Sequence, residues 1–180
     1  KITINSAGIY TITGKLNDGQ IIVDAGKNDK VKLILNGVDI NCSNSAPVYV
    51  VNADKTVIDL KDGSNNTITD GKDYVFEDSS SEEPNSAIYS KDDLTISGEG
   101  SLTVNGNYNN GITSKDDLKI TGGNITVTAV NHGIKGKDSV KIKEGNIKIT
   151  ADGDGIKTDN IEETEKGYVY IASGTIDITT

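Results

Sequence analysis

Five aspartates recur in a repeated phrase, and they are the residues of this chain best suited to chemistry. Ser90-Lys-Asp-Asp-Leu94 returns as Ser114-Lys-Asp-Asp-Leu118 and, with substitutions, as Gly136-Lys-Asp-Ser-Val140. If successive copies stack in register as strands, equivalent residues lie about 4.8 Å apart. The stacked carboxylates then line one edge of the molecule: Asp92, Asp93, Asp116, Asp117 and Asp138.

Carboxylates stacked this closely call for a counter-ion. Two of them about 5 Å apart repel by roughly 1 kcal/mol at the dielectric of bulk water, and by several-fold more near a protein surface. Carboxylate, carbonyl and water oxygens are the ligands of Ca²⁺, and the sequence offers no histidine or cysteine cluster for a softer metal. The pattern therefore predicts a calcium site. The alternative is that these aspartates cap their own turns, with Lys91, Lys115 and Lys137 offsetting part of the repulsion.

A second acidic group follows near residue 155. Asp152 and Asp154 alternate with glycines, and Asp159 comes shortly after them. The spacing is similar to that of calcium-binding loops, but the glutamate at position twelve and the flanking helices of an EF-hand are missing. We predict that these three residues also hold a metal between coils. Ordinary glycine-rich corner turns are the alternative.

The elements that must position these residues follow from the repeat itself. The phrases recur with a period near 22 residues, and each is followed by short segments in which apolar and polar residues alternate, such as Val140 to Ile142 and Ile147 to Ile149. A period of this length indicates a solenoid, and the alternation indicates strands with one buried face. We predict an all-β fold: a single-stranded, right-handed parallel β-helix, a pectate-lyase-like solenoid with three short strands per coil.

Residues 1–180 are expected to form a single β-helix domain with two insertions. Residues 61–86 are acidic, polar and rich in serine, which predicts a long loop that leaves the helix body. A smaller insertion is predicted at 160–167. Long loops on a rigid scaffold often border a functional site.

An outer face of the predicted coils suggests carbohydrate binding. The residues that follow the inward aliphatic positions include Tyr49, Tyr89, Lys135 and Lys157, which would form a column of outward side chains. Tyrosine rings can lie against sugar faces, and lysines can pair with uronate carboxylates or donate to hydroxyls. An ordinary solvated face is the alternative.

Composition excludes several other functions. A net charge of −9 without a single arginine disfavours nucleic acid as a partner. No hydrophobic run is long enough to cross a membrane, and the lone Cys42 allows no internal disulfide. The chain starts at Lys1 without a methionine, so a secretion signal or an anchor could have been removed. The oligomeric state is open.

Catalysis is harder to assign than binding. The single histidine, His132, lies in an Asn-His-Gly turn with no nucleophile that the sequence identifies. β-Elimination on a uronate needs a lysine or arginine base, and Lys135 and Lys157 are the candidates, although an ordinary lysine is protonated at neutral pH.

The repeats resemble a known family. Ser114-Lys-Asp-Asp-Leu-Lys-Ile-Thr-Gly-Gly-Asn-Ile-Thr-Val-Thr128 and Asp152-Gly-Asp-Gly-Ile-Lys157 are similar to segments of the bacterial extracellular carbohydrate-binding domain family, whose polysaccharide-lyase-like β-helices bind cellulose and acidic sugars. The resemblance is clear over residues 86–159. It implies a secreted or surface-anchored protein that contains calcium and binds plant cell-wall polysaccharide, cellulose or pectin components such as polygalacturonic acid, without cleaving it. By the same resemblance, Asp92, Asp93, Asp116 and Asp117 occupy calcium positions of lysine-based pectate lyases. A calcium-dependent pectate lyase and a structural or adhesive surface protein are the alternatives.

Overall fold

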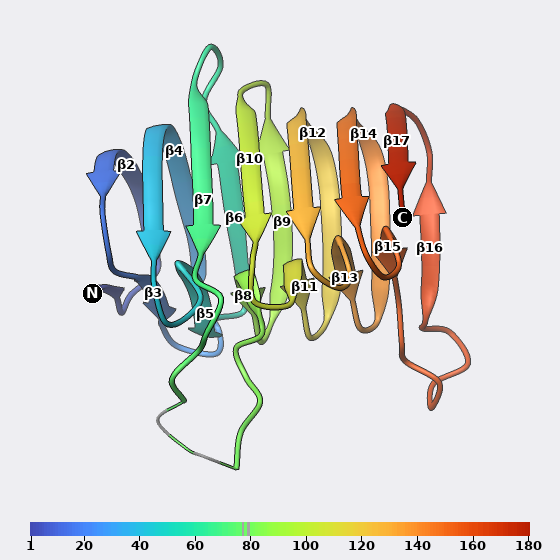
Figure 1. Ribbon diagram of the computed structural model, residues 1–180, viewed down its shortest axis with the longest axis horizontal. Helices are drawn as coiled ribbons and strands as arrows, with labels where there is room; N and C mark the ends of the chain where they lie inside the picture. Colours follow the sequence, from blue (N-terminus) through green and yellow to red (C-terminus); the bar gives the residue numbers. More distant parts are fainter. Residues whose placement is uncertain (77, 79) are drawn as a thin grey trace.

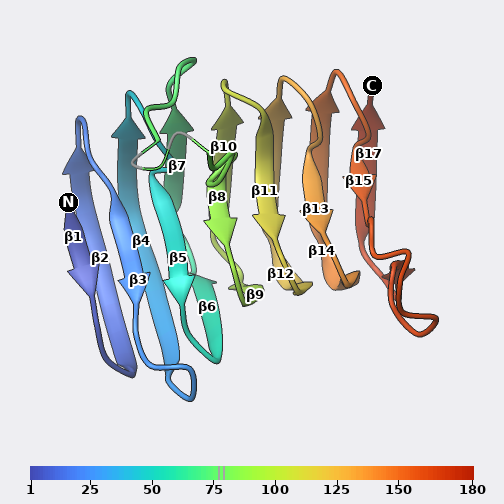
Figure 2. The same ribbon diagram turned by 90° about the horizontal axis from the view of Figure 1, so that it is seen from below.

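The computed structural model describes residues 1–76, 78 and 80–180, and in this part of the chain every strand pairing is parallel (Figure 1). Each strand pairs with its equivalents in the preceding and following turns of the chain, so strands far apart in sequence lie side by side. Parallel neighbours of this kind require the chain to return to the same side of the molecule before each new strand begins. The alternating patterns of the sequence thus become successive coils, and the two termini lie at opposite ends of the stack (Figure 2).

One sheet of seven strands forms a wall that we call wall A (Figure 2). Each coil contributes one short strand to it. In spatial order the strands are β1 (Ile2–Ile4), β3 (Ile21–Asp24), β5 (Val48–Asn52), β8 (Ser86–Ser90), β11 (Asn110–Ser114), β13 (Ile134–Gly136) and β15 (Ile156–Lys157).

A second sheet of ten strands forms the other two sides. Its members are β2 (Gly8–Leu16), β4 (Lys30–Cys42), β6 (Lys55–Leu60), β7 (Asn65–Asp70), β9 (Asp93–Gly98), β10 (Ser101–Gly106), β12 (Asp117–Ala129), β14 (Ser139–Ala151), β16 (Tyr168–Ile171) and β17 (Thr175–Thr179). Strand β2 pairs with β4, and β12 pairs with β14. Each of these pairings runs along two segments, called legs, with a break in register between them. The first legs, with β6, β9 and β16, are called wall B; the second legs, with β7, β10 and β17, are called wall C.

The sequence prediction of three strand positions per coil agrees with this arrangement, with one difference. In β2, β4, β12 and β14 the legs on walls B and C belong to one continuous strand instead of two separate ones. The all-β fold with parallel strands is confirmed. The right-handed sense of the winding stays a prediction, which follows from the general preference for right-handed crossovers between parallel strands.

The core consists of aliphatic columns that run from coil to coil. Leu94 pairs with Leu118 and then Val140, and Ile120 pairs with Ile142, as the repeats predict. These side chains are at most 1% exposed. Each buried aliphatic side chain contributes roughly 1.5–3 kcal/mol, so thin columns stabilise a chain with few aromatic residues.

The predicted long loop at 61–86 is wrong in its first part. Residues 65–70 form β7, which pairs with β4 and β10. The strand was hidden because two of its inward positions are polar: Asn66 and Asp70 are buried and hydrogen-bonded to the backbone of neighbouring segments. The connection that leaves the wall is 71–85, of which residues 77 and 79 lie outside the described part. The smaller insertion, 160–167, lies between β15 and β16.

Candidate functional site

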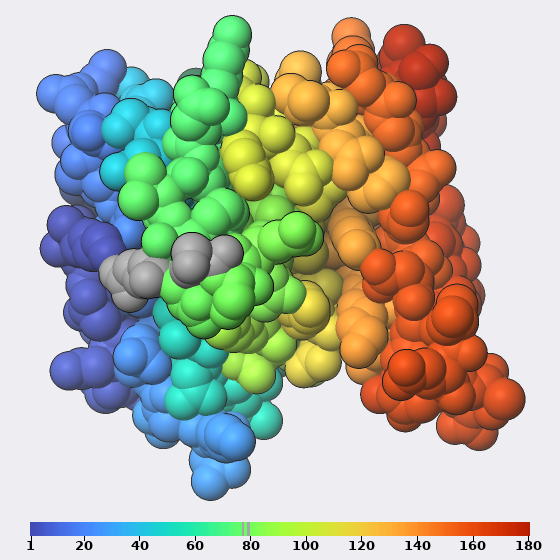
Figure 3. Space-filling view, turned by 60° about the horizontal axis from the view of Figure 1, so that its bottom comes forward, coloured from blue at the N-terminus to red at the C-terminus, as the bar shows by residue number. Residues whose placement is uncertain are grey.

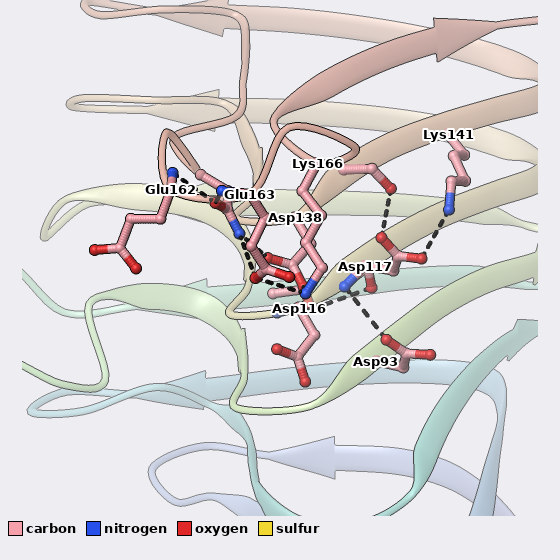
Figure 4. A network of polar contacts seen from close by, with 11 residues as sticks. Asp93, Asp116, Asp117, Asp138, Lys141, Glu162, Glu163 and Lys166 are labelled. Carbon is pink, nitrogen blue, oxygen red and sulfur yellow. Dashed lines mark hydrogen bonds and ion pairs between the residues drawn. The ribbon is translucent and has the colours of Figure 1, made fainter.

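The repeated aspartates lie together at the edge where the chain passes from wall A to wall B (Figure 4). The main-chain nitrogen of Asp117 donates to Asp93 Oδ1 at 3.3 Å, and the nitrogen of Asp138 donates to the carbonyl oxygen of Asp116 at 3.2 Å. Asp92 accepts from the nitrogen of Ala53 at 2.9 Å. The coils therefore bring the five predicted residues into one ladder, as their spacing in the sequence indicates.

Two carboxylates of the ladder are neutralised by lysines. Lys141 Nζ lies 2.7 Å from Asp117 Oδ2, and Lys166 Nζ lies 2.9 Å from Asp138 Oδ2. Burial pushes the pKa of Asp117 upward, but hydrogen bonds from Lys141 and Ser139 outweigh it and leave the pKa lowered. Asp138 behaves in the same way: hydrogen bonds from Asn160 and Lys166 overcome the effect of burial and lower its pKa.

Two other carboxylates of the ladder, those of Asp116 and Asp93, form no ion pair with a lysine of the described residues. Within the described residues the carboxylate of Asp116 accepts no hydrogen bond and joins no ion pair, and burial together with the charges of Asp138, Asp93 and Asp92 raises its pKa. Burial also raises the pKa of Asp93, and the charge of Asp117 adds to the effect. A cavity of about 410 Å³ opens here, with Lys166 and Tyr168 on its other side. The ladder thus holds excess negative charge beside an open space.

In the described part of the chain, no group of three or more histidine, cysteine, aspartate or glutamate side chains is gathered closely enough to hold a metal ion. The donor types nevertheless fit calcium, because oxygen ligands on neighbouring coils are what this hard cation prefers. Among the described residues, Asp116 is the ladder carboxylate that has neither a hydrogen-bond donor nor an ion-pair partner. The structure shows carboxylates in reach of one another, with Lys141 and Lys166 holding two of them.

The second predicted metal group is not assembled. All three of its aspartates are exposed. Asp154 Oδ2 lies 3.2 Å from Lys157 Nζ, and Asp159 Oδ2 lies 2.6 Å from Lys135 Nζ. These side chains reach to separate lysines, and Asp152 joins neither pair. Lys157 and Lys135 therefore form ion pairs with two of the three carboxylates that the sequence analysis assigned to a metal.

Wall A carries a polar cavity of about 180 Å³, called here the wall A pocket. Its lining includes two carboxylates and three lysines: Glu83, Asp159, Lys115, Lys135 and Lys137. Lys115 pairs with Glu83 at 2.5 Å and Lys135 with Asp159, whereas Lys137 forms no ion pair with the described residues. The pocket therefore has one more amine than it has carboxylates, on a chain whose net charge is −9.

Tyr89 lines the same pocket but cannot act as an open stacking platform. The sequence predicts an outward ring, yet the side chain is 0% exposed, and Glu83 of the segment that precedes β8 lies near its hydroxyl. Figure 3 shows the described part of that segment (green) lying over this face of the stack. The hydroxyl makes no hydrogen bond of acceptable geometry with the described residues, although burial and the nearby carboxylate of Glu83 raise its pKa.

The other two predicted sugar-binding residues lie on either side of the pocket. Tyr49, half-buried, packs edge-on against Tyr89 with ring centroids 5.8 Å apart. Lys157 Nζ lies 3.1 Å from His132 Nε2, and the nitrogen of Asp154 donates to His132 Nδ1. Burial and the charge of Lys157 lower the pKa of His132. The histidine thus has partners that the sequence analysis missed, but none of them is a nucleophile.

Several residues of both sites were missed from the sequence. Lys115 and Lys137 occupy equivalent positions in the repeated phrase, and both line the pocket. The recurrence of lysine at this position of the repeat could have identified them. Glu83 and Lys166 come from the two insertions, which have no repeat partner to place them. Only the fold shows that both insertions return to the coil edges.

A solved structure described as the polysaccharide lyase-like protein from C. thermocellum, gadolinium derivative, superposes with a TM-score of 0.97 at 55% identity, covering 98% of this chain and 71% of that one.

The chain belongs to the family of carbohydrate-binding domain-containing proteins, whose model matches residues 1–180. A carbohydrate-binding domain-containing protein of Acetivibrio thermocellus is 57% identical over 178 residues, which is 99% of this chain. The chain spans 62% of the length of that relative. In the described part of the chain, no helix has the length and apolar character that crossing a membrane requires.

Proposed function

We propose that this protein binds plant cell-wall polysaccharide outside the cell, both cellulose and acidic sugars such as polygalacturonate, with calcium and without cleaving the polymer. The observation that carries the proposal is the wall A pocket, which Lys115, Lys135 and Lys137 line and in which Lys137 forms no ion pair with the described residues. Amines pair with uronate carboxylates, and an open polar pocket accepts one sugar of a longer chain. The extracellular location rests on the family resemblance, and so does the right-handed β-helix that would present these walls.

Calcium is proposed for the ladder of Asp92, Asp93, Asp116, Asp117 and Asp138. These side chains would have to move closer together to hold it, and Asp117 and Asp138 would have to leave their lysines. When bound, the ion would neutralise the stacked carboxylates and offer free coordination positions to a uronate. Asp152, Asp154 and Asp159 remain a weaker proposal, since lysines now hold two of them.

Co-sedimentation with a panel of insoluble polysaccharides tests the function. We expect the protein to sediment with cross-linked polygalacturonate and with cellulose, and a chelator should reduce the binding to polygalacturonate. A structural or adhesive protein without a sugar ligand would stay in the supernatant with every polymer of the panel.

Asp116→Asn should stabilise the calcium-free protein by up to about 1 kcal/mol at pH 7, the usual size of an interaction between partly exposed charges. The substitution removes a charge whose pKa is raised by burial and three carboxylates. Asp117→Asn is the matched control and should destabilise, because Asp117 loses its bonds to Lys141 and Ser139. Thermal unfolding in the presence of chelator measures both changes.

The same pair of variants gives a pH dependence. A carboxyl whose pKa is raised by folding contributes stability below its ordinary pKa and loses that contribution as the pH rises through the raised value. The advantage of Asp116→Asn should therefore vanish at about pH 3, below the ordinary carboxyl pKa. An advantage that persists at this pH would show that charge is not its cause.

Tyr89→Phe separates binding from stability. Removing a buried, unpaired hydroxyl should leave the free energy of unfolding unchanged or raise it by about 1 kcal/mol. Because the hydroxyl is buried, affinity for oligogalacturonate should stay unchanged. Calorimetric titration and thermal unfolding of the same preparation provide the two readouts, and a loss of affinity without a loss of stability would show that the bound sugar reaches the hydroxyl.

A calcium-dependent lyase is the second candidate, favoured by one observation on wall B. Lys119 lies beside Asp93 and Asp117 in a cavity of about 170 Å³, and the charge of Lys143, together with burial, Lys55 and Lys141, lowers its pKa. A lysine with a lowered pKa can accept the C5 proton of a uronate while the bond to the C4 oxygen breaks. Lys135 and Lys157, the bases considered from the sequence, instead pair with Asp159 and Asp154. Ultraviolet absorption of unsaturated product from polygalacturonate would establish this activity.

A further inference from the structure

Glu83 places a carboxylate of the chain itself against an amine of the wall A pocket. Its Oε1 atom lies 2.5 Å from Lys115 Nζ, and both residues line the pocket. Burial pushes the pKa of Glu83 upward, but the hydrogen bond and the charge of Lys115 outweigh it and leave the pKa lowered. The hydroxyl of Tyr89 and the charge of Lys91 act in the same direction. Glu83 is therefore ionised at neutral pH, and its charge lies inside the proposed sugar site.

Lys115 is the middle member of a column of three lysines. Lys91, Lys115 and Lys137 hold the same place in successive copies of the repeated phrase, and the main-chain nitrogen of each donates to a carbonyl oxygen of the preceding coil. Stacked coils place such equivalent residues about 4.8 Å apart. In the described part of the chain, neither Lys91 nor Lys137 forms an ion pair, so the carboxylate of Glu83 is held by the middle amine alone.

Hydrogen bonds on both sides of Glu83 fix the segment that carries it. The main-chain nitrogen of Glu83 donates to Ser81 Oγ at 3.1 Å. Two residues further on, the carbonyl oxygen of Asn85 accepts from the main-chain nitrogen of Asn110 at 3.1 Å and from its Nδ2 atom at 3.2 Å. Asn110 belongs to β11, the strand that ends just before Lys115. The segment is therefore tied to the same coil as the amine that its carboxylate contacts.

A uronate sugar would offer this amine the same chemical group that Glu83 already supplies. An amine makes its strong, charge-assisted hydrogen bonds to a carboxylate from either source. Two carboxylates about 5 Å apart repel by roughly 1 kcal/mol at the dielectric of bulk water, and by more near a protein surface. A uronate that reaches Lys115 therefore competes with Glu83, whereas a uronate at Lys137 meets an amine without an ion-pair partner.

We propose that Glu83 is an internal substitute for a uronate in the wall A pocket, and that an acidic glycan replaces it at Lys115 on binding. The inference rests on the proposed function, because it assumes that this pocket binds acidic sugars. It adds how the affinity of the site is set. Lys137 is open to the first carboxylate of the glycan, and Lys115 becomes available only when the side chain of Glu83 leaves it.

Glu83→Gln tests the inference, because glutamine keeps the shape of the side chain and removes its charge. Affinity for trigalacturonate should rise roughly three- to fivefold, as expected for the loss of one repulsion between partly exposed charges. Glu82→Gln is the matched control, because Glu82 is exposed, does not line the pocket and gives the same change in net charge. Its affinity should stay close to the wild-type value. Calorimetric titration measures binding, and thermal unfolding checks that each variant is folded.

A second measurement needs no sugar. Brief treatment with acetic anhydride followed by mass spectrometry reports how accessible each amine is to the reagent. Lys115 should be acetylated faster in Glu83→Gln than in the wild-type protein, because the ion pair shields its amine, while Lys137 should react equally in both. Equal rates at Lys115 would show that Glu83 does not hold this amine in solution and would overturn the inference.

The binding outcomes separate this inference from the proposed function. Wild-type protein that binds trigalacturonate, with no gain of affinity in Glu83→Gln, would overturn the inference and leave the proposed function standing. An equal gain in Glu82→Gln would attribute the effect to net charge and would also overturn it. If neither the wild-type protein nor Glu83→Gln binds trigalacturonate, the acidic-sugar site of the proposed function is wrong, and the inference is wrong with it.

Discussion

Replacing Lys115, Lys135 and Lys137 together by alanine should weaken binding of oligogalacturonate more than tenfold and leave the fold intact. These amines supply the positive charge of the wall A pocket, and each charge-assisted hydrogen bond to a carboxylate contributes roughly 1.5–3 kcal/mol. Loss of even one such bond corresponds to a factor of about ten. Calorimetric titration with oligogalacturonate measures the change.

The control must match the change in net charge, because removing three lysines makes an acidic protein more acidic. Lys27, Lys72 and Lys148 are exposed and do not line the pocket, so their triple alanine variant carries the same charge without altering the proposed site. We expect its affinity to stay within about twofold of the wild-type value, since exposed charges beyond a Debye length of about 8 Å are largely screened. Equal losses in both triple variants would show that binding depends on overall charge alone.

Gly133→Ala should destabilise the protein by about 3 kcal/mol, the upper end of the usual cost of overpacking a core. A Cβ at this position would lie 2.4 Å from Ile149 Cγ2 and 2.7 Å from the carbonyl oxygen of Gly155. Neither neighbour can move freely, since Ile149 is fully buried and Gly155 belongs to the next coil. Equilibrium unfolding in denaturant measures the loss.

Gly19→Ala is the matched control for this prediction. Its added Cβ would come no closer than 3.3 Å to the flexible end of Leu16, and its backbone does not have a positive φ. We expect a change within about 1 kcal/mol, of either sign, because alanine also reduces the entropy of the unfolded chain. If Gly133→Ala costs no more than this control, the tight contact between coils is not a source of stability.

Much of the fold follows from the sequence because the repeat carries it. Once the phrases are aligned, the columns of Leu94, Leu118 and Val140 and the aspartate ladder need only the spacing of stacked strands. β7 was missed for a physical reason: its inward Asn66 bonds the backbone nitrogens of Gly37 and Val38. A buried polar residue that satisfies a turn in another coil leaves no periodic apolar signal.

The sites were predicted less completely than the fold. The sequence placed the ladder aspartates together but could not show that Lys141 and Lys166 neutralise two of them, because Lys166 comes from an insertion. The sequence analysis placed Tyr89 on the correct wall but predicted an exposed ring, whereas the side chain is buried. Glu83, which lies near its hydroxyl, belongs to a segment that does not repeat. Contacts made by unique segments depend on the path of the chain, and a repeat pattern contains no information about that path.

The most direct test of the account is to map the binding of trigalacturonate by amide chemical-shift perturbation on labelled protein, with calcium present. If the wall A pocket binds the sugar, the shifts should be saturable and concentrated at residues 83–85, 113–115 and 135–137, with smaller changes at the ladder. Shifts confined to another wall, or no saturable shifts at any concentration, would contradict the claim that the wall A pocket binds acidic sugars.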